Sequence, residues 1–178
     1  MYKIAVLSDS HKKVDLTKDA IDMLKSKGAQ YIVHAGDLEI KENLELLKNS
    51  GLIYVSVFGN NDRNLIQYQN DYKIFQEPYH FSIKKLKYKL MHIPNYLTAD
   101  SDIIIYGHTH IFKTEYINNT LFLNPGELCA REKELTECVL LEVYDDKYIV
   151  EYNYKKPDEK KWETKTFRYE RELRNNEK

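Results

Sequence analysis

Short apolar runs alternate with amphipathic segments over the first sixty residues. Taken in order, the pattern predicts a strand at 3–8, a helix at 14–27, a strand at 31–33, a helix at 41–49 and a strand at 52–58. Gly28 directly follows the first amphipathic segment, and Gly51 comes shortly after the second. The two glycines mark the ends of these predicted helices. Strands and helices that alternate at this spacing predict a parallel sheet with right-handed crossover connections.

After residue 71 the pattern changes to short β-type runs. These runs cover 79–83, 88–92, 103–106, 114–117, 120–123, 138–144 and 148–154. The turn-forming pairs Asn118-Asn119 and Asp145-Asp146 separate neighbouring runs at hairpin spacing. The second half is therefore expected to be mostly antiparallel.

A charged, proline-containing loop at 155–161 leads into a last run at 162–169, which we expect to form an extra edge strand. The chain then ends in a charged segment from about residue 171. Together the two halves predict an α/β fold, an αββα sandwich of two sheets flanked by helices, in a single domain over 1–178.

Composition narrows the classes of partner. Lys+Arg 27 against Asp+Glu 28 gives a formal net charge of −1, which argues against a nucleic-acid partner. Apolar runs do not exceed four residues, far below the ~20 that a membrane-spanning helix needs, and the N-terminus lacks a signal-peptide core. We therefore expect a cytoplasmic protein with no membrane association. Its two cysteines, Cys129 and Cys138, are expected to be reduced.

Acidic, amide and imidazole side chains follow the predicted strands of the first half. Asp9 and His11 come after the first strand, Asp37 after the second and Asn60 after the third. In an open parallel sheet the carboxyl ends of neighbouring strands share one edge, so these groups are expected to converge.

The second half adds three imidazoles. His92 ends one apolar run, while His108 and His110 follow another and project to the same side in extended backbone. Seven donors exceed the shell of one four- to six-coordinate ion that keeps a position for water, but two ions that share a carboxylate can use them. An oxygen and nitrogen set without thiolate favours Mn²⁺, with Ni²⁺, Fe, Co²⁺ or Zn²⁺ as alternatives, and weighs against Mg²⁺ or Ca²⁺.

Five motif blocks carry a family resemblance. They are D-x-H at 9–11, G-D at 36–37, G-N-x-D at 59–62, the single His92 and G-H-x-H at 107–110. In this order they resemble the calcineurin-like metallophosphoesterase family, and Asn124-Pro125-Gly126 resembles a segment of its small bacterial and archaeal phosphodiesterase branch.

The resemblance implies two divalent metal ions with Asp37 as the shared ligand. It assigns the first ion to Asp9, His11, Asp37 and His110, and the second ion to Asp37, Asn60, His92 and His108. A hydroxide that bridges two such ions attacks phosphorus in line, while both ions neutralise the phosphate oxygens. The expected activity is hydrolysis of a phosphodiester.

One position departs from a pattern common in the family, in which a histidine stands where this chain has Asn61. An amide can donate a hydrogen bond to the substrate but cannot act as a general acid near neutral pH. We therefore expect diesters to be hydrolysed in preference to phosphomonoesters.

The remaining groups allow more than one interpretation. Lys12, Lys13, Arg63 and Arg131 lie near motif blocks and are candidate phosphate contacts or solvated surface charges. His34 is expected to pack behind the site, and Asp62 either orients the loop or caps the segment after it. Four lysines, Lys84, Lys85, Lys87 and Lys89, predict a solvated hairpin face.

The competing function is a protein-interaction scaffold, because the retromer subunit that resembles these enzymes has an altered metal pocket. All seven donor positions are occupied by competent residues here, which favours the enzyme. A nuclease acting on a larger substrate is a third alternative, against which the near-zero net charge argues. A small phosphodiester substrate and self-association as a dimer or tetramer are the expected partners; the residues do not define the natural diester.

Overall fold

The computed structural model describes residues 1–171. The elements are β1 (Tyr2–Leu7), α1 (Val14–Ser26), β2 (Tyr31–His34), α2 (Lys41–Asn49), β3 (Ile53–Val57), the 3₁₀ helix η1 (Arg63–Tyr68), β4 (Ile74–Phe75), β5 (Tyr79–Ile83), β6 (Leu86–Leu90), β7 (Ile103–Ile105), β8 (Lys113–Ile117), β9 (Thr120–Asn124), β10 (Thr136–Val143), β11 (Lys147–Lys155) and β12 (Glu163–Glu170). The charged end expected from residue 171 lies, apart from Arg171, outside the described residues.

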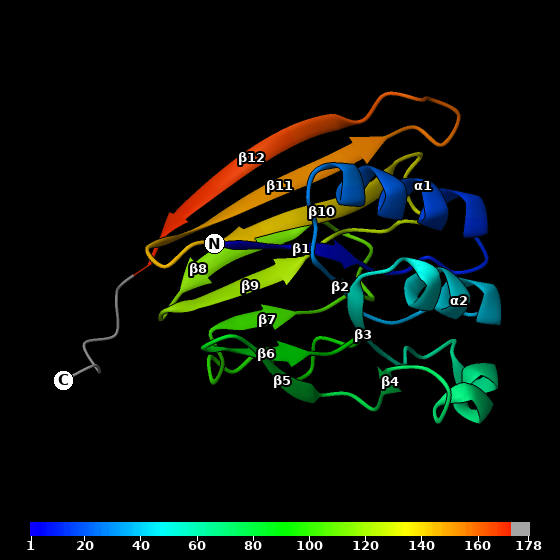
Figure 1. The fold of residues 1–178 in the computed structure, drawn as a ribbon, viewed down its shortest axis with the longest axis horizontal. Helices are drawn as coiled ribbons and strands as arrows, with labels where there is room; N and C mark the ends of the chain where they lie inside the picture. Colours follow the sequence, from blue (N-terminus) through cyan, green and yellow to red (C-terminus); the bar gives the residue numbers. More distant parts are fainter. Residues whose placement is uncertain (172–178) are drawn as a thin grey trace.

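Within the described residues the strands form two sheets (Figure 1). One has the order β12-β11-β10-β1-β2-β3-β4 and the other the order β5-β6-β7-β9-β8. The strands β1 to β4 are parallel to one another, as the alternation of strands and helices predicts. The two-sheet α/β architecture expected from the sequence is confirmed.

The second half of the chain contributes to both sheets. β10 returns to the first sheet and pairs antiparallel with β1, and β11 and β12 continue that sheet to its edge. Most of the remaining pairs are antiparallel as expected, but β7 pairs parallel with both β6 and β9. β12, which corresponds to the last predicted run, lies at the edge of the first sheet, as expected.

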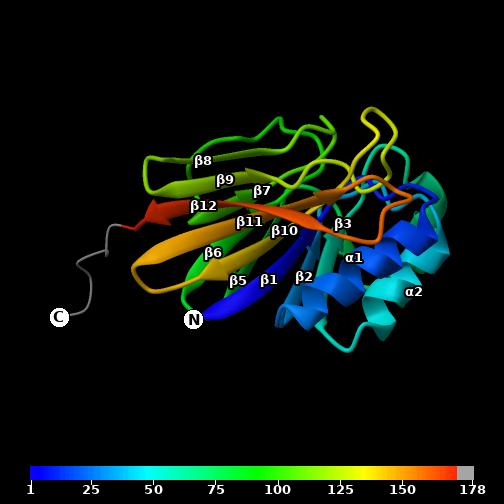
Figure 2. The same cartoon turned by 90° about the horizontal axis from the view of Figure 1, so that it is seen from above.

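Alternation of side chains along β1 explains the layers. Ile4 and Val6 face the second sheet and pack in a core with Leu90, Ile105 and Leu123. The neighbouring side chains of β1, Ala5 and Leu7, face the other way and pack with buried side chains of α1 and α2. Both α-helices thus cover one face of the first sheet (Figure 2). The outer face of the second sheet carries a small separate cluster that includes Ile104 and Phe122.

Three local features differ from the sequence prediction. The sequence pattern does not predict η1 or β4, because a six-residue 3₁₀ helix and a two-residue strand are too short to produce a periodic signal. The expectation that all four hairpin lysines are solvated is wrong for Lys89. Its side chain is buried and its ammonium group lies 2.6 Å from Asp100 Oδ1 and donates to Thr98 O at 3.0 Å.

The cysteines and the helices bear on two further expectations. Cys129 and Cys138 are both buried and free, as predicted. In the described part of the chain, the helices are too short and too polar to cross a membrane.

Candidate metal centre

The seven predicted donors follow strand ends that meet at one place. Asp9 and His11 lie after β1, Asp37 after β2 and Asn60 after β3; His92 follows β6, and His108 and His110 follow β7. Backbone hydrogen bonds join these loops, from Asp9 N to Gly36 O (3.0 Å), from His11 N to Asp37 O (2.8 Å) and from Gly107 N to His92 O (3.1 Å). The two sheets thus bring residues far apart in sequence to a common edge.

One group of donors gathers around His92. Its Nε2 atom lies 3.0 Å from Asn60 Oδ1, 3.3 Å from His108 Nδ1 and 3.4 Å from Asp37 Oδ2. His108 Nδ1 is also 3.1 Å from Asn60 Oδ1. These four side chains are the set that the family resemblance assigns to a second ion. Asn60 and His108 are exposed, so this side of the centre opens to solvent.

The other group also lies near Asp37. His110 Nε2 lies 3.2 Å from Asp9 Oδ1, and His11 Nε2 lies 3.9 Å from Asp37 Oδ2. The same carboxylate oxygen of Asp37 therefore faces an imidazole of each group. This is the position that a shared ligand requires.

Outer partners hold three of the imidazole rings. His92 Nδ1 is 2.8 Å from Ala35 O, His11 Nδ1 is 3.1 Å from Glu39 Oε2, and His110 Nδ1 is 2.7 Å from Glu127 Oε2. Each contact leaves the Nε2 atom of that ring facing the centre. Partners of this kind fix the ring and make the facing nitrogen a better metal ligand.

Sequence reasoning missed both Glu39 and Glu127. Glu127 follows Asn124-Pro125-Gly126, but nothing in its spacing indicates that it reaches His110. Its carboxylate also accepts the backbone N–H groups of Arg131, Glu132 and Lys133, at 2.7 to 3.1 Å. Glu127 therefore organises a whole loop beside the centre.

Backbone strain is concentrated at the centre. Five of the seven donors have a left-handed φ, namely Asp9 (52°), His11 (46°), Asp37 (58°), His108 (68°) and His110 (58°). Residues other than glycine adopt the left-handed backbone region at a cost of order 1–3 kcal/mol, and residues strained in this way cluster at functional sites. The packing around these five residues must therefore hold them in conformations that they would otherwise avoid.

Two glycines of the motif blocks permit close packing there. A Cβ atom on Gly59 would lie 2.2 Å from Asp37 Oδ1, and a Cβ atom on Gly107 would lie 2.0 Å from Ser8 Oγ. Real Cβ atoms do not approach other atoms so closely. Glycine is required at both positions by space.

Opposite charges set the protonation of the centre. Burial opposes ionisation of Asp37, but the hydrogen bond and charge of His92 outweigh it and hold the pKa of Asp37 well below its usual value. Burial likewise opposes a charge on His92, yet Asp37 raises the pKa of His92 to about 9. For Asp9, burial is outweighed by His110 and by the charge of His92, so its pKa is also lowered. Both carboxylates are therefore ionised at neutral pH.

One buried atom indicates that a cation fits. His11 Nε2 is buried and, among the described residues, has no hydrogen-bond partner. Buried polar atoms in folded proteins are nearly always paired. A cation that accepts the lone pair of this nitrogen would satisfy it, and the carboxylates and imidazoles around it are donors that divalent transition-metal ions accept.

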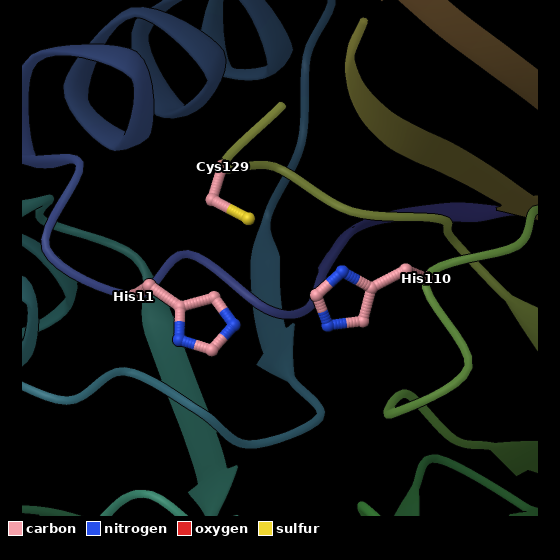
Figure 3. Close-up of side chains that lie close together, drawn as sticks. All are labelled: His11, His110 and Cys129. Atoms are coloured by element: carbon pink, nitrogen blue, oxygen red, sulfur yellow. The ribbon is translucent and has the colours of Figure 1, made fainter. Parts of the chain in front are cut away.

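A sulfur atom lies in this centre, which the sequence-derived donor set lacked. Ligand atoms of His11, His110 and Cys129 all lie within 4.8 Å of one another, and the three side chains are buried (Figure 3). Ligand atoms of Asp9, Asp37 and His92 also lie within 4.8 Å of one another. The tertiary structure thus places a thiol beside two of the seven predicted donors, a neighbour that the sequence pattern does not predict.

Asn61 and Asp62 support the loop after β3. Asn61 donates to Asp37 from its backbone N–H (2.9 Å) and from Nδ2 (2.7 Å). Asp62 accepts the backbone N–H groups of Asp37 (2.9 Å), Glu39 (2.6 Å) and Gly59 (2.8 Å). Its side chain makes no capping hydrogen bond to η1, so of the two interpretations the loop role is the observed one.

A pocket of about 310 Å³ opens beside His11. It is lined by His11, Lys12, Lys13, Glu39, Cys129, Ala130 and Arg131. Three of the four candidate phosphate contacts line it, and Arg63 does not. The ammonium group of Lys12 lies 3.2 Å from Glu39 Oε1.

His34 packs behind the centre as expected. It is fully buried, and its Nε2 atom lies 3.0 Å from Ser10 Oγ, between the two donors of the loop after β1. Burial lowers the pKa of His34 to about 3, so it is neutral at physiological pH.

This chain is similar to several known proteins in sequence or in fold. A phosphodiesterase of Methanocaldococcus jannaschii is 25% identical over 141 residues, which cover 72% of this chain and 85% of that protein. Among solved structures, the YfcE phosphoesterase of E. coli matches with a TM-score of 0.67 and 21% identity, over 84% of this chain and 91% of that chain. Vps29 of Entamoeba histolytica, complexed with Zn²⁺, matches with a TM-score of 0.67 and 20% identity, over 94% and 98%.

The two solved structures show the shared fold, since their identity to this chain is low. The family is shown by the match of residues 2–146 to the model of the calcineurin-like phosphoesterase superfamily domain. That range contains all seven predicted donors as well as Glu39, Glu127 and Cys129. The chain belongs to the calcineurin-like phosphoesterase superfamily.

Proposed function

We propose that this protein is a phosphodiesterase that uses two divalent metal ions, one held by Asp9, His11, Asp37 and His110, the other by Asp37, Asn60, His92 and His108. The observation that carries the proposal is the position of Asp37 Oδ2. It lies 3.9 Å from His11 Nε2 and 3.4 Å from His92 Nε2, so it is near an imidazole of each donor group. A carboxylate in that place is the shared ligand that a two-ion centre needs.

Divalent ions held there supply an activated water for attack on phosphorus and neutralise the charge on the phosphate oxygens. The chain's own residues hold the ligands of these ions and orient them. Glu39 and Glu127 fix the rings of His11 and His110, and Asp62 fixes the loop backbone on which Asp37 stands. Preorganised groups of this kind need no rearrangement during the reaction.

The preference for diesters rests on position 61. Asn61 donates to Asp37 at the exposed side of the centre, and its amide has no proton to give to a leaving group near neutral pH. A diester with a good leaving group needs no such proton. Lys12, Lys13 and Arg131 line the neighbouring pocket and can meet phosphate oxygens of a small substrate.

The competing function is a binding module without catalysis. The match to Vps29, a protein named for vacuolar protein sorting, favours this alternative. Against it stand the buried carboxylates of Asp9 and Asp37 and the buried His11 Nε2, which has no hydrogen-bond partner among the described residues, because a scaffold has no need of such donors.

The test is hydrolysis of bis-p-nitrophenyl phosphate by protein stripped with a chelator and reloaded with Mn²⁺, Ni²⁺, Co²⁺ or Zn²⁺. p-Nitrophenyl phosphate is the matched monoester, and Asp37→Asn is the control variant. We expect metal-dependent cleavage of the diester, faster than that of the monoester, and its loss in the variant. No turnover with any ion, despite measured metal uptake, would favour the binding module; a faster monoester reaction would overturn the preference for diesters.

A further inference from the structure

The thiol of Cys129 lies outside the donor set of the proposed function but inside the same cluster. Its residue is 2% exposed, and its sulfur atom lies within 4.8 Å of ligand nitrogens of His11 and His110. In Figure 3 the sulfur points from above toward the space between the two imidazole rings. We propose that Cys129 Sγ is a further ligand of the ion held by His11 and His110, and that this position therefore takes a thiophilic ion such as Zn²⁺ or Co²⁺.

The backbone holds Cys129 at this place. Its N–H donates to Asp9 O at 3.1 Å, and the N–H of Leu128 donates to Ser8 O at 3.1 Å. The segment that carries the thiol is thus bonded directly to the loop that carries Asp9 and His11. The following residue, Ala130, has a left-handed φ of 54°, like five of the metal donors.

The unpaired nitrogen of His11 is the second observation. Glu39 occupies Nδ1, so Nε2 is the atom left for a ligand, and it is buried without a hydrogen-bond partner among the described residues. Bonds of about 2.3 Å to sulfur and about 2.1 Å to nitrogen place neighbouring ligand atoms roughly 3.0–3.6 Å apart at bond angles of roughly 90–110°. The ligand atoms of the three side chains lie within 4.8 Å of one another, so they need to close by no more than roughly 1.8 Å.

Binding of the ion replaces one proton. In the free protein the S–H of Cys129 donates weakly to Glu127 Oε2 at 3.4 Å. On binding, the S–H bond breaks, the sulfur lone pair forms the bond to the ion, and the proton leaves to solvent through the pocket that Cys129 lines. No oxidation or reduction is involved. The same Glu127 keeps its contact with His110 Nδ1.

The chemical consequence is selectivity between the two positions. A thiolate favours Zn²⁺ and Co²⁺ over Mn²⁺, whereas the group around His92 offers oxygen and nitrogen alone. This selectivity deepens the proposed function and rests on its metal centre. We therefore expect Mn²⁺ to prefer the position around His92, which has no sulfur donor, and Zn²⁺ or Co²⁺ to prefer the position at His11 and His110, which has the thiol.

Titration of the chelator-stripped protein with Co²⁺ tests the proposal by absorbance. Visible ligand-field bands report that Co²⁺ is bound, and a near-ultraviolet charge-transfer band reports a thiolate ligand. Cys129→Ala is compared with Cys138→Ala, which removes a buried thiol of the apolar core instead. We expect the charge-transfer band in the wild type and in the Cys138 variant, and in the Cys129 variant ligand-field bands without it and at least tenfold weaker Co²⁺ binding.

The failures are distinguishable. Ligand-field bands without a charge-transfer band in the wild type would overturn the sulfur ligand and leave the proposed function standing. Absence of both bands would overturn the metal centre itself. A charge-transfer band that persists in Cys129→Ala would assign the sulfur elsewhere and also overturn the proposal. If far-ultraviolet circular dichroism shows that Cys129→Ala does not fold, Cys129→Ser is measured in its place.

Discussion

The carboxylate of Glu127 holds His110 from behind, with Oε2 at 2.7 Å from Nδ1 of the imidazole. The same carboxylate gathers the backbone N–H groups of residues 131–133. These donors and His110 outweigh the effect of burial and lower the pKa of Glu127, so it stays ionised. Glu127 therefore links the orientation of a proposed ligand to the shape of a neighbouring loop.

Glu127→Gln keeps the size of this side chain and removes its charge. We expect metal affinity to fall by about 10–100-fold, because partners behind a ligating histidine contribute about that much. Isothermal titration with Zn²⁺ or Mn²⁺ measures the change. Glu132→Gln is the control, since Glu132 is exposed in the same loop; an equal loss in both variants would contradict the role of Glu127.

Replacing Asn61 tests the origin of substrate preference. Asn61→His introduces a group that can donate a proton at the exposed side of the centre, and general acid catalysis contributes about 10²–10⁴ in rate. We expect the ratio of monoester to diester hydrolysis to rise at least tenfold, with a new basic limb in the pH profile of monoester cleavage. Asn61→Gln should leave the ratio unchanged. An unaltered ratio in the histidine variant would mean that position 61 does not reach the leaving group.

Gly59→Ala places a methyl group against Asp37. The added Cβ would lie 2.4 Å from the backbone nitrogen of Asp37 as well as against its carboxylate. We expect thermal unfolding to show a loss of about 1–3 kcal/mol and metal affinity to fall with it. Gly51→Ala is the comparison: it meets open space but has a φ of 78°, so it should cost stability without weakening metal binding.

His34 should make the metal-free protein less stable in mild acid. Burial lowers its folded-state pKa to about 3, below the ordinary value of 6.5. As the pH falls through 6.5 the unfolded chain takes up a proton that the folded protein does not, so stability that is present above pH 6.5 is lost as the pH falls toward 3.

At pH 5 this loss amounts to at most about 2 kcal/mol. Urea unfolding at pH 7 and pH 5, with chelator present, measures it. His34→Gln keeps a partner for Ser10 but cannot titrate, so its stability should fall less between the two pH values. The other histidines are present in both proteins, and equal losses would exclude His34 as the cause.

Periodicity along the chain is enough to define the order of the main elements and the edge at which the chemistry lies. Hydrophobic spacing places β1 to β3 and the two helices, and a donor at the end of a parallel strand is near the next donor because such strands share one edge. That rule is enough for Asp9, His11, Asp37 and Asn60. It is not enough for β4 and η1, which are too short for a periodic signal.

The surroundings of those donors depend on tertiary packing. Glu39, Glu127 and Cys129 stand in loops, whose path follows from hydrogen bonds such as the one from Cys129 N to Asp9 O. Loop side chains have no period that links them to a partner far along the chain. The position of Lys89 is predicted wrongly for a related reason. Alternation along the strand predicts that its side chain is solvated, but the loop that carries Asp100 covers this side chain and supplies its counter-charge. Patterns along the chain define elements and their edges, whereas contacts between loops exist once the sheets have packed.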